Sequence, residues 1–153
     1  MMKGEVLMAI VLNNFKEKQR FKKETFERKV LRDLSLATIK KEFQRLFQPF
    51  FQYSLLYQND IEDACIDMAI DSYLLGAGYS RFAYHGETLE KIKERAYAKQ
   101  QAIADGLFEY WQFWCWGTEM MMESLHLCCE AFVHIWWMEG YKNGEKRYRM
   151  KLQ

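Results

Sequence analysis

Apolar residues recur every three or four positions through most of the chain, whereas the alternating pattern typical of strands is nearly absent. Such spacing places apolar side chains on one face of an α-helix. Val, Ile and Thr, the residues that favour strands, are sparse, and the chain has one proline, Pro49. The pattern therefore predicts the all-α fold class.

Two helices are expected in the first third of the chain. The first begins at Asn14, whose side chain can cap the helix while Glu17 stands three residues later, as in a capping box. Ser35 can cap the second helix. Pro49 ends this second helix, because the residue before a proline avoids helical geometry.

The middle of the chain predicts a third helix from Ile61 to Leu75. Asp60 stands at its N-cap position. Gly76 and Gly78 mark its end, since glycine readily takes the left-handed conformation that stops a helix. A loop is expected to follow, over residues 77–86.

Two long helices are expected in the second half of the chain. One runs from about residue 87 to about residue 116 and becomes apolar nearly all round in its last third. Thr118 can cap the other, which reaches Gly140.

The chain has 153 residues, of which 50% are hydrophobic and 16% aromatic. This length and composition suit one globular domain with its own core, and they exclude a disordered chain. We therefore expect residues 1–153 to form a single-domain helical bundle of about five helices. The N-terminal segment 1–13 and the basic tail 142–153 are expected to be peripheral.

The formal net charge is +1, but the charges are unevenly distributed. Residues 1–49 carry a net charge of +6, and residues 50–90 carry −6. We interpret this as a basic N-terminal element that lies near an acidic middle element within one fold; the alternative is a basic surface for a partner. The small total charge, and the separation of Trp from Lys and Arg along the chain, argue against nucleic-acid binding.

The four cysteines form no CxxC pair and stand among apolar residues, which is typical of buried, reduced thiols. Because disulfides are rare in the cytosol, we expect a cytoplasmic protein. Val6–Leu12 is apolar but lacks the cleavage site that would follow in a signal peptide. The uncharged aromatic segments 110–118 and 131–138 are much shorter than the roughly 20 residues of a transmembrane helix.

The last helix carries a row of acidic and histidine side chains within an arc of about 80°. The members of this Glu/His row are Glu119, Glu123, His126, Glu130 and His134. Glu123 and His126 form E-x-x-H, the spacing with which di-iron bundles place two ligands on one metal. Carboxylate and imidazole bind zinc, iron or manganese, so Glu123, His126, Glu130 and His134 are the candidate metal ligands.

The Glu/His row also fits a narrow solvent-facing strip on a helix that is packed on its other sides. The sequence favours this second interpretation, because a di-iron site needs another E-x-x-H and none occurs. We accordingly expect no cofactor, with zinc, iron or manganese as the alternative.

A second row, the acidic stripe, runs along the third helix. It consists of Asp60, Asp63, Asp67 and Asp71. If the stripe faced the Glu/His row, Asp67 and Asp71 could complete a site for a metal or a polar substrate. If it faced the basic first helix, the aspartates would pair with Lys and Arg. The charge distribution favours this pairing.

Other catalytic motifs are absent or incomplete. The sequence contains no phosphate-binding glycine loop and no nucleophile elbow. Cys129 and His126 have a spacing that brings them onto neighbouring helix faces, but the apolar surroundings favour an inert thiol. Trp137 falls on the polar side of the last helix, where an exposed indole would mark a partner surface.

The stretch DACIDMAIDSYLLGAGYSRFAYHGETLEKI (63–92) is the most distinctive part of the chain. Together with LRDLSL (31–36) and WWMEG (136–140), it resembles the YbaK-like family of Bacillus and relatives, from about residue 15 to about residue 148. That family is distinct from the similarly named aminoacyl-tRNA editing domain. The resemblance implies a cytoplasmic bacterial protein with no established activity and supplies no functional residues.

We expect the protein to act through contacts with other proteins, including those of a homodimer, rather than as an enzyme. The expected working surface is the basic first helix or the strip around Trp137. The alternative is a metal-dependent helical-bundle enzyme that uses the Glu/His row. A further alternative is peripheral membrane association, in which Phe15 and Phe26 contact lipid from the basic first helix.

Overall fold

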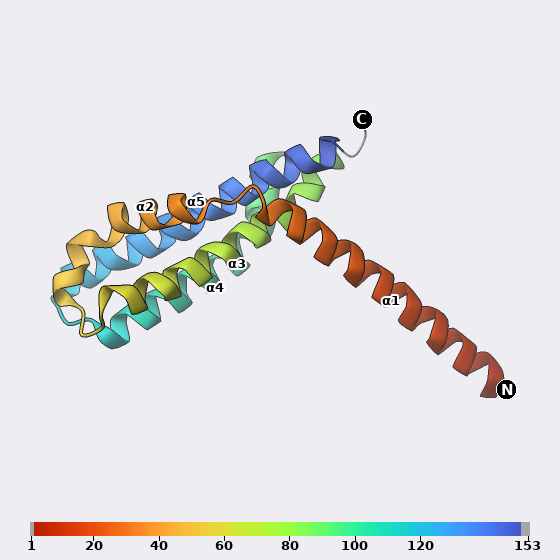
Figure 1. The fold of residues 1–153 in the computed structure, drawn as a ribbon, viewed down its shortest axis with the longest axis horizontal. Coiled ribbons are helices and arrows are strands. Elements are labelled where there is room, and N and C mark those ends of the chain that lie inside the picture. The colour runs from red at the N-terminus through yellow and green to blue at the C-terminus, as the bar shows by residue number, and fades with distance from the viewer. Residues whose placement is uncertain (1, 151–153) are drawn as a thin grey trace.

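The computed structural model describes residues 2–150 as a helical protein (Figure 1). Five α-helices and one 3-10 helix follow one another: α1 Met2–Leu31, α2 Leu36–Phe47, η1 Gln48–Tyr53, α3 Gln58–Tyr84, α4 Leu89–Trp114 and α5 Glu119–Met150. No strand occurs over this range; a single antiparallel bridge joins Ser54 to Cys115. The predicted all-α class and the single five-helix bundle are confirmed.

Short polar side chains cap the starts of α2 and α5. Ser35 Oγ accepts a hydrogen bond from the Thr38 N–H at the start of α2. Thr118 Oγ1 accepts one from the Met121 N–H at the start of α5, so both predicted caps are confirmed. Asp60 was expected to cap α3, but it lies within the first turn of that helix. A carboxylate there still faces the positive end of the helix dipole.

The helices α3 and α5 cross closely at glycines. A Cβ atom added to Gly76 would lie 1.9 Å from the Trp137 carbonyl oxygen, and one added to Gly140 would lie 1.8 Å from the Tyr73 carbonyl oxygen. Gly144 is also buried against α3. The predictions that Gly76 ends the third helix and Gly140 the last are therefore wrong: these glycines serve close packing.

Both helices continue well beyond their expected ends. α3 includes most of the predicted loop 77–86 and ends at Tyr84, just before Gly86, whose φ of 92° is the left-handed stop. α5 includes residues 142–150, the first part of the segment expected to be a peripheral tail. Residues 151–153 of that segment, and residue 1 of the N-terminal segment, lie outside the described residues.

Aromatic residues fill the core between α2, η1, α3, α4 and α5. Trp111 stacks on Phe47 at 5.1 Å between ring centroids, and Phe47 meets the edge of Phe132 at 5.5 Å. Trp137 is fully buried and stacks on Tyr141 at 5.5 Å, so the prediction of an exposed Trp137 is wrong. Because α3 and α5 are longer than predicted, they pack against each other at Trp137, and its side chain becomes buried.

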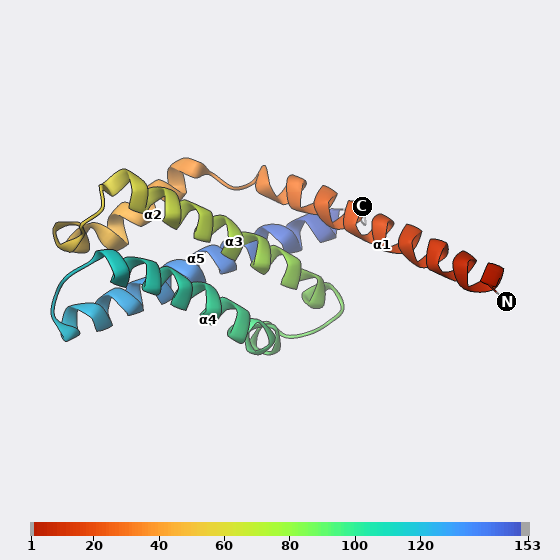
Figure 2. The same ribbon diagram turned by 90° about the horizontal axis from the view of Figure 1, so that it is seen from below.

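Helix α1 leaves the bundle and projects into solvent, as two perpendicular views show (Figures 1 and 2). Its last two turns pack on α3, where Phe26 and Val30 contact Tyr73 and Ala77. All side chains of residues 3–24 are exposed, and we call this projecting part the arm. The helix was expected to begin at Asn14, but the preceding apolar residues continue it back to the second residue.

Two polar contacts hold the base of α1 on the bundle. The buried Tyr73 hydroxyl donates to the Val30 carbonyl oxygen at 2.6 Å. Just after α1, Arg147 of α5 donates two hydrogen bonds to the Asp33 carboxylate, at 2.8 and 2.9 Å. The guanidinium of Arg147 lowers the pKa of Asp33 below its usual range. The arm is therefore attached at its base alone.

Candidate functional site

The Glu/His row of α5 lies along the edge of α4. His126 Nε2 is 3.1 Å from Asp105 Oδ1, and His126 Nδ1 is 3.2 Å from Glu130 Oε1. A neutral imidazole can donate to one of these carboxylates, whereas an imidazolium can donate to both. Hydrogen bonds from His126 and Gln101 lower the pKa of Asp105. The row thus forms a polar link between two helices.

About two turns beyond His126, His134 borders a groove between α4 and α5 with a volume of about 400 Å³. Its Nδ1 atom is 3.0 Å from Gln100 Nε2. Partial burial, and then the charge of Lys93, lower the pKa of His134, so its neutral form is favoured. The groove is lined by Lys93, Tyr97, Gln100, Gln101, Ala104, Glu130, Ala131 and His134.

Metal-binding geometry is not assembled around these residues. Across the part of the chain that the structure describes, no group of three or more His, Cys, Asp or Glu side chains is arranged to hold a metal ion. Asp67 and Asp71 lie exposed on α3, and partial burial, together with the charge of Asp67, raises the pKa of Asp71. The Glu/His row finds its acidic neighbour in Asp105 instead, a residue for which the sequence offered no motif.

The cysteines are free thiols held in their protonated form. Burial raises the pKa of Cys65 to about 12. Burial likewise raises the pKa of Cys128 and of Cys129, the thiol considered for a pair with His126. Because the thiolate is the nucleophilic form, this environment opposes thiol chemistry.

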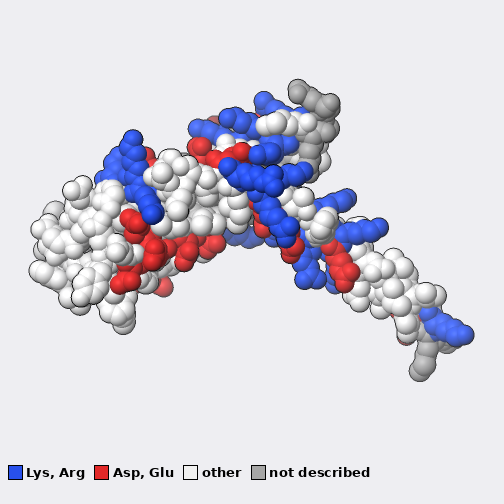
Figure 3. Space-filling model, viewed as in Figure 1, with Lys and Arg blue, Asp and Glu red and all other residues white. Residues whose placement is uncertain are grey.

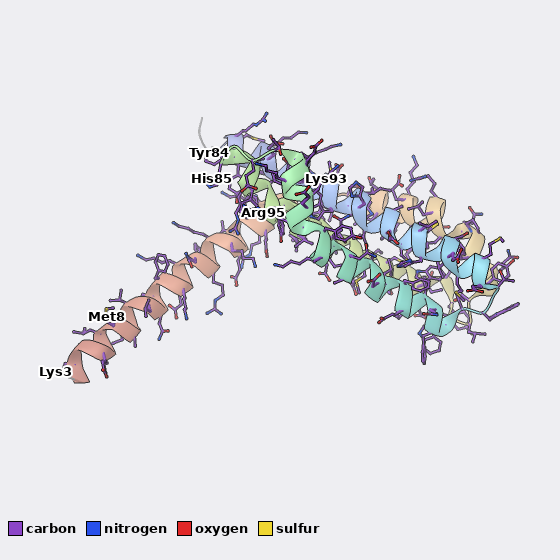
Figure 4. The ribbon with its side chains drawn as sticks, turned by 180° about the vertical axis from the view of Figure 1, so that it is seen from behind. Lys3, Met8, Tyr84, His85, Lys93 and Arg95 are labelled. Carbon is purple, nitrogen blue, oxygen red and sulfur yellow. The ribbon has the colours of Figure 1, made fainter. Side chains whose placement is uncertain are left out.

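The arm carries the largest run of exposed apolar side chains. In its apolar stretch, Val6–Leu12, every large side chain is at least 50% exposed: Val6, Leu7, Met8, Ile10, Val11 and Leu12. Figure 4 shows Lys3 and Met8 on the arm, far from the other helices. The basic stretch that follows, residues 16–23, holds five Lys and Arg against one Glu.

A second exposed apolar surface lies at the opposite end of the bundle, where η1 meets α3 and α4 meets α5. We call it the apolar end; its members are Leu55, Tyr57, Phe113, Trp116 and Met120. Backbone hydrogen bonds from Leu55 N–H to the Trp114 carbonyl oxygen (2.7 Å) and from Trp116 N–H to the Tyr53 carbonyl oxygen (2.9 Å) join the two connections. This surface is held in place by those bonds.

The acidic stripe of α3 lies between the apolar end and the base of α1. Asp60, Asp63, Asp67 and Asp71 are all exposed. In Figure 3 red acidic side chains follow the body beside its white end, and blue basic side chains gather along the middle of α1. Among the described residues, no ion pair joins the stripe to α1.

The expected pairing of the basic first helix with the acidic middle of the chain is therefore not made within one copy. α1 contacts the second half of α3, around Tyr73 and Ala77, and then points away from the stripe. Asp33, which lies just after α1, instead forms an ion pair with Arg147 of α5. Both charged surfaces remain open to solvent.

Comparison with known proteins agrees with the family resemblance of the sequence. Residues 8–153 match the family described as Protein of unknown function (DUF2521). The Uncharacterized protein YbaK of Bacillus subtilis (strain 168) is 27% identical over 148 residues, which cover 95% of this chain and 100% of that protein. No solved structure matches the chain. The match over nearly the whole length shows that the chain belongs to the DUF2521 family.

Proposed function

We propose that the protein acts by binding another protein chain through the arm. The observation that carries this proposal is the apolar stretch Val6–Leu12, which is exposed on the part of α1 that projects from the bundle. Most of the stability of a protein helix comes from packing its apolar face. Apolar side chains on all sides of an isolated helix are typical of an element that becomes buried in an interface.

The arm also has the polar features of a protein-binding helix. Its basic stretch, residues 16–23, is separated from the end of the apolar stretch by three residues. Charged residues around an apolar core steer association and select partners of opposite charge. We therefore propose that the bound surface combines apolar and acidic side chains.

The cytoplasm is the compartment we propose for this binding. The four free cysteines, whose thiols are partly or fully buried, support a reducing environment. In the part of the chain that the structure describes, no helix has the length and apolar character required to cross a membrane.

The metal-dependent alternative receives no support from the described geometry. Of its proposed ligands, His126 and Glu130 contact each other, while His134 bonds to Gln100. Asp67 and Asp71 stand on α3 and make no described contact with them. Protein binding is therefore the function that we propose.

A site-specific photocrosslinker tests the proposal in living cells. We place the photoreactive residue at Val11 in the arm and, as a matched control, at the exposed Ala98 of α4. Val11 is expected to give a discrete protein adduct that mass spectrometry can identify, and Ala98 is expected to give none. Lipid adducts alone, or an equal pattern at both positions, would contradict binding of a protein by the arm.

A further inference from the structure

We propose that the arm binds a second copy of this chain, along the acidic stripe of the partner's α3. In the resulting two-fold dimer each arm lies on the other copy, with its apolar stretch against the apolar end of the partner. The inference rests on the proposed function, since it assigns a partner to the same arm. The exposed area of the chain, the opposite charges of the two surfaces and the spacing of their residues each support it.

The area that one copy exposes in excess of a compact monomer matches the area that each copy of an obligate dimer buries. The chain exposes 10544 Å², whereas a compact monomer of its mass exposes about 8,200 Å². The excess is about 2,300 Å² per copy, and obligate homodimers bury about 1,000–2,500 Å² per copy. An exchange of arms would bury a surface of this size.

The charges of the two surfaces are complementary. Leu7, Val11, Phe15, Lys18 and Lys22 follow one another on a single side of the arm, within an arc of about 80°. The acidic stripe repeats at the same intervals of three and four residues. Lys18 and Lys22 can therefore face Asp67 and Asp71, which have the same spacing and no described basic partner within their own copy.

The order of apolar and charged residues also agrees between the two surfaces. Leu7 precedes Lys18 by 11 residues, or about 16 Å of helix. Leu55 and Tyr57 precede Asp67 by 12 and 10 residues. When the arm lies parallel to the partner's α3 with Lys18 opposite Asp67, Leu7 consequently reaches the apolar end. Leu7 then meets apolar side chains, and Lys18 and Lys22 meet Asp67 and Asp71, while Val11 and Phe15 lie at the level of Asp60 and Asp63.

This alignment is compatible with two-fold symmetry. Within one copy α1 runs toward the base of the bundle, and α3 runs from the apolar end toward the same base (Figures 1 and 2). A two-fold rotation can therefore place the arm of each copy parallel to α3 of the other. The two contacts are then identical, so the assembly closes as a dimer instead of growing into a filament.

Mass measurement with charge-reversed variants tests the dimer. At about 50 µM, light scattering should give twice the chain mass of 18.5 kDa. Lys18→Glu with Lys22→Glu should raise the dimer Kd at least about 100-fold, because like charges then face each other at both contacts. Asp67→Lys with Asp71→Lys should do the same. Combining all four substitutions should restore the Kd to within about tenfold of the original.

The control reverses Lys40 and Lys41 to Glu on α2, which changes the net charge equally, and should leave the Kd within about threefold. These lysines and both arm lysines are exposed, so circular dichroism should show the folded bundle in each variant. A monomer at 50 µM would overturn the dimer, whether the arm then binds vesicles, folds onto its own α3 or binds a different protein. A dimer without rescue by the fourfold variant would overturn the assignment to the acidic stripe.

The two proposals can fail separately. If the chain is monomeric but Val11 crosslinks to a different protein, binding by the arm stands and the dimer is overturned. If the chain is dimeric but neither the lysine reversals nor a Val11→Asp substitution changes the Kd, the arm has no part in the interface and the dimer inference is overturned. If Val11 also gives no protein adduct in the crosslinking experiment, the proposed function is overturned as well.

Discussion

The hydroxyl of Tyr73 joins three helices at the base of the arm. It donates to the Val30 carbonyl oxygen of α1 at 2.6 Å and accepts from Asn143 Nδ2 of α5 at 3.0 Å. Burial raises the pKa of Tyr73, so the phenol remains a donor over the physiological pH range. Removing this buried hydroxyl costs more than one average hydrogen bond, because the Asn143 amide would then lose its acceptor and the Val30 carbonyl oxygen one of its two donors.

Replacement of Tyr73 by Phe should lower the free energy of unfolding by about 1–3 kcal/mol, because the Asn143 amide loses its acceptor and the Val30 carbonyl oxygen keeps only the Asp33 N–H as a donor. Urea denaturation measures the change. The matched control is Tyr97→Phe, at an exposed position of α4, which should change stability by less than about 0.5 kcal/mol. Equal effects of the two substitutions would show that the Tyr73 hydroxyl does not support the junction.

At the scale of the helices, the crossing of α3 and α5 depends on the absence of side chains. The Tyr73 carbonyl oxygen occupies the place where a Cβ of residue 140 would be. Gly78 is also helical, but it is exposed and has nothing within 4 Å of its Cβ position. Gly140 is therefore needed for the close packing of two helices, whereas no neighbouring atom requires a glycine at position 78.

Gly140→Ala should destabilise the bundle by about 3 kcal/mol, since the backbones of α3 and α5 must move apart. Gly78→Ala should stabilise it by about 0.5–1 kcal/mol, because alanine loses less backbone entropy in a helix. Thermal or urea unfolding of both variants provides the comparison. A destabilised Gly78→Ala protein, or an unaffected Gly140→Ala protein, would contradict the crossing described here.

Some features of the helices can be predicted from the sequence, and others cannot. Caps such as Ser35 and Thr118 depend on neighbours three residues away, so the sequence reveals them. Gly76 and Gly140 were interpreted as helix ends because glycine both stops helices and permits close crossings. Only the position of the neighbouring helix distinguishes these uses, and that information is not local.

The candidate site likewise combines residues whose spacing the sequence reveals with partners that lie far away along the chain. The spacing of Glu123, His126, Glu130 and His134 placed them on one face of a helix. Their partners Asp105 and Gln100 come from α4, 21 and 34 residues away in the chain. Trp137 was assigned to the polar side of α5, but α3 packs over that side near Gly76.

The bundle and the arm contribute differently to the stability of the whole protein. The bundle has its own cores, and the arm contributes no side-chain burial to them. A dimer formed through the arm would link folding to protein concentration, because unfolding then requires dissociation.

The melting temperature of the original chain should rise by about 2 °C for each tenfold rise in protein concentration. The Leu7→Asp, Val11→Asp variant should melt at a temperature that does not depend on concentration, since its arm can no longer enter an apolar interface. Differential scanning calorimetry over a hundredfold concentration range measures both slopes. Identical slopes would contradict a contribution of the arm to association.

Because α1 is attached through its last two turns alone, a small tilt at its base moves the tip of the arm over a much larger distance. Residues 3–24 span about 33 Å, so a tilt of about 10° at the base displaces the tip by about 6 Å. Small rearrangements around Tyr73 and Arg147, where the base is held, are thus amplified at Val6–Leu12. A change in the packing of the bundle would therefore be transmitted over this distance as a change in where a bound partner is held.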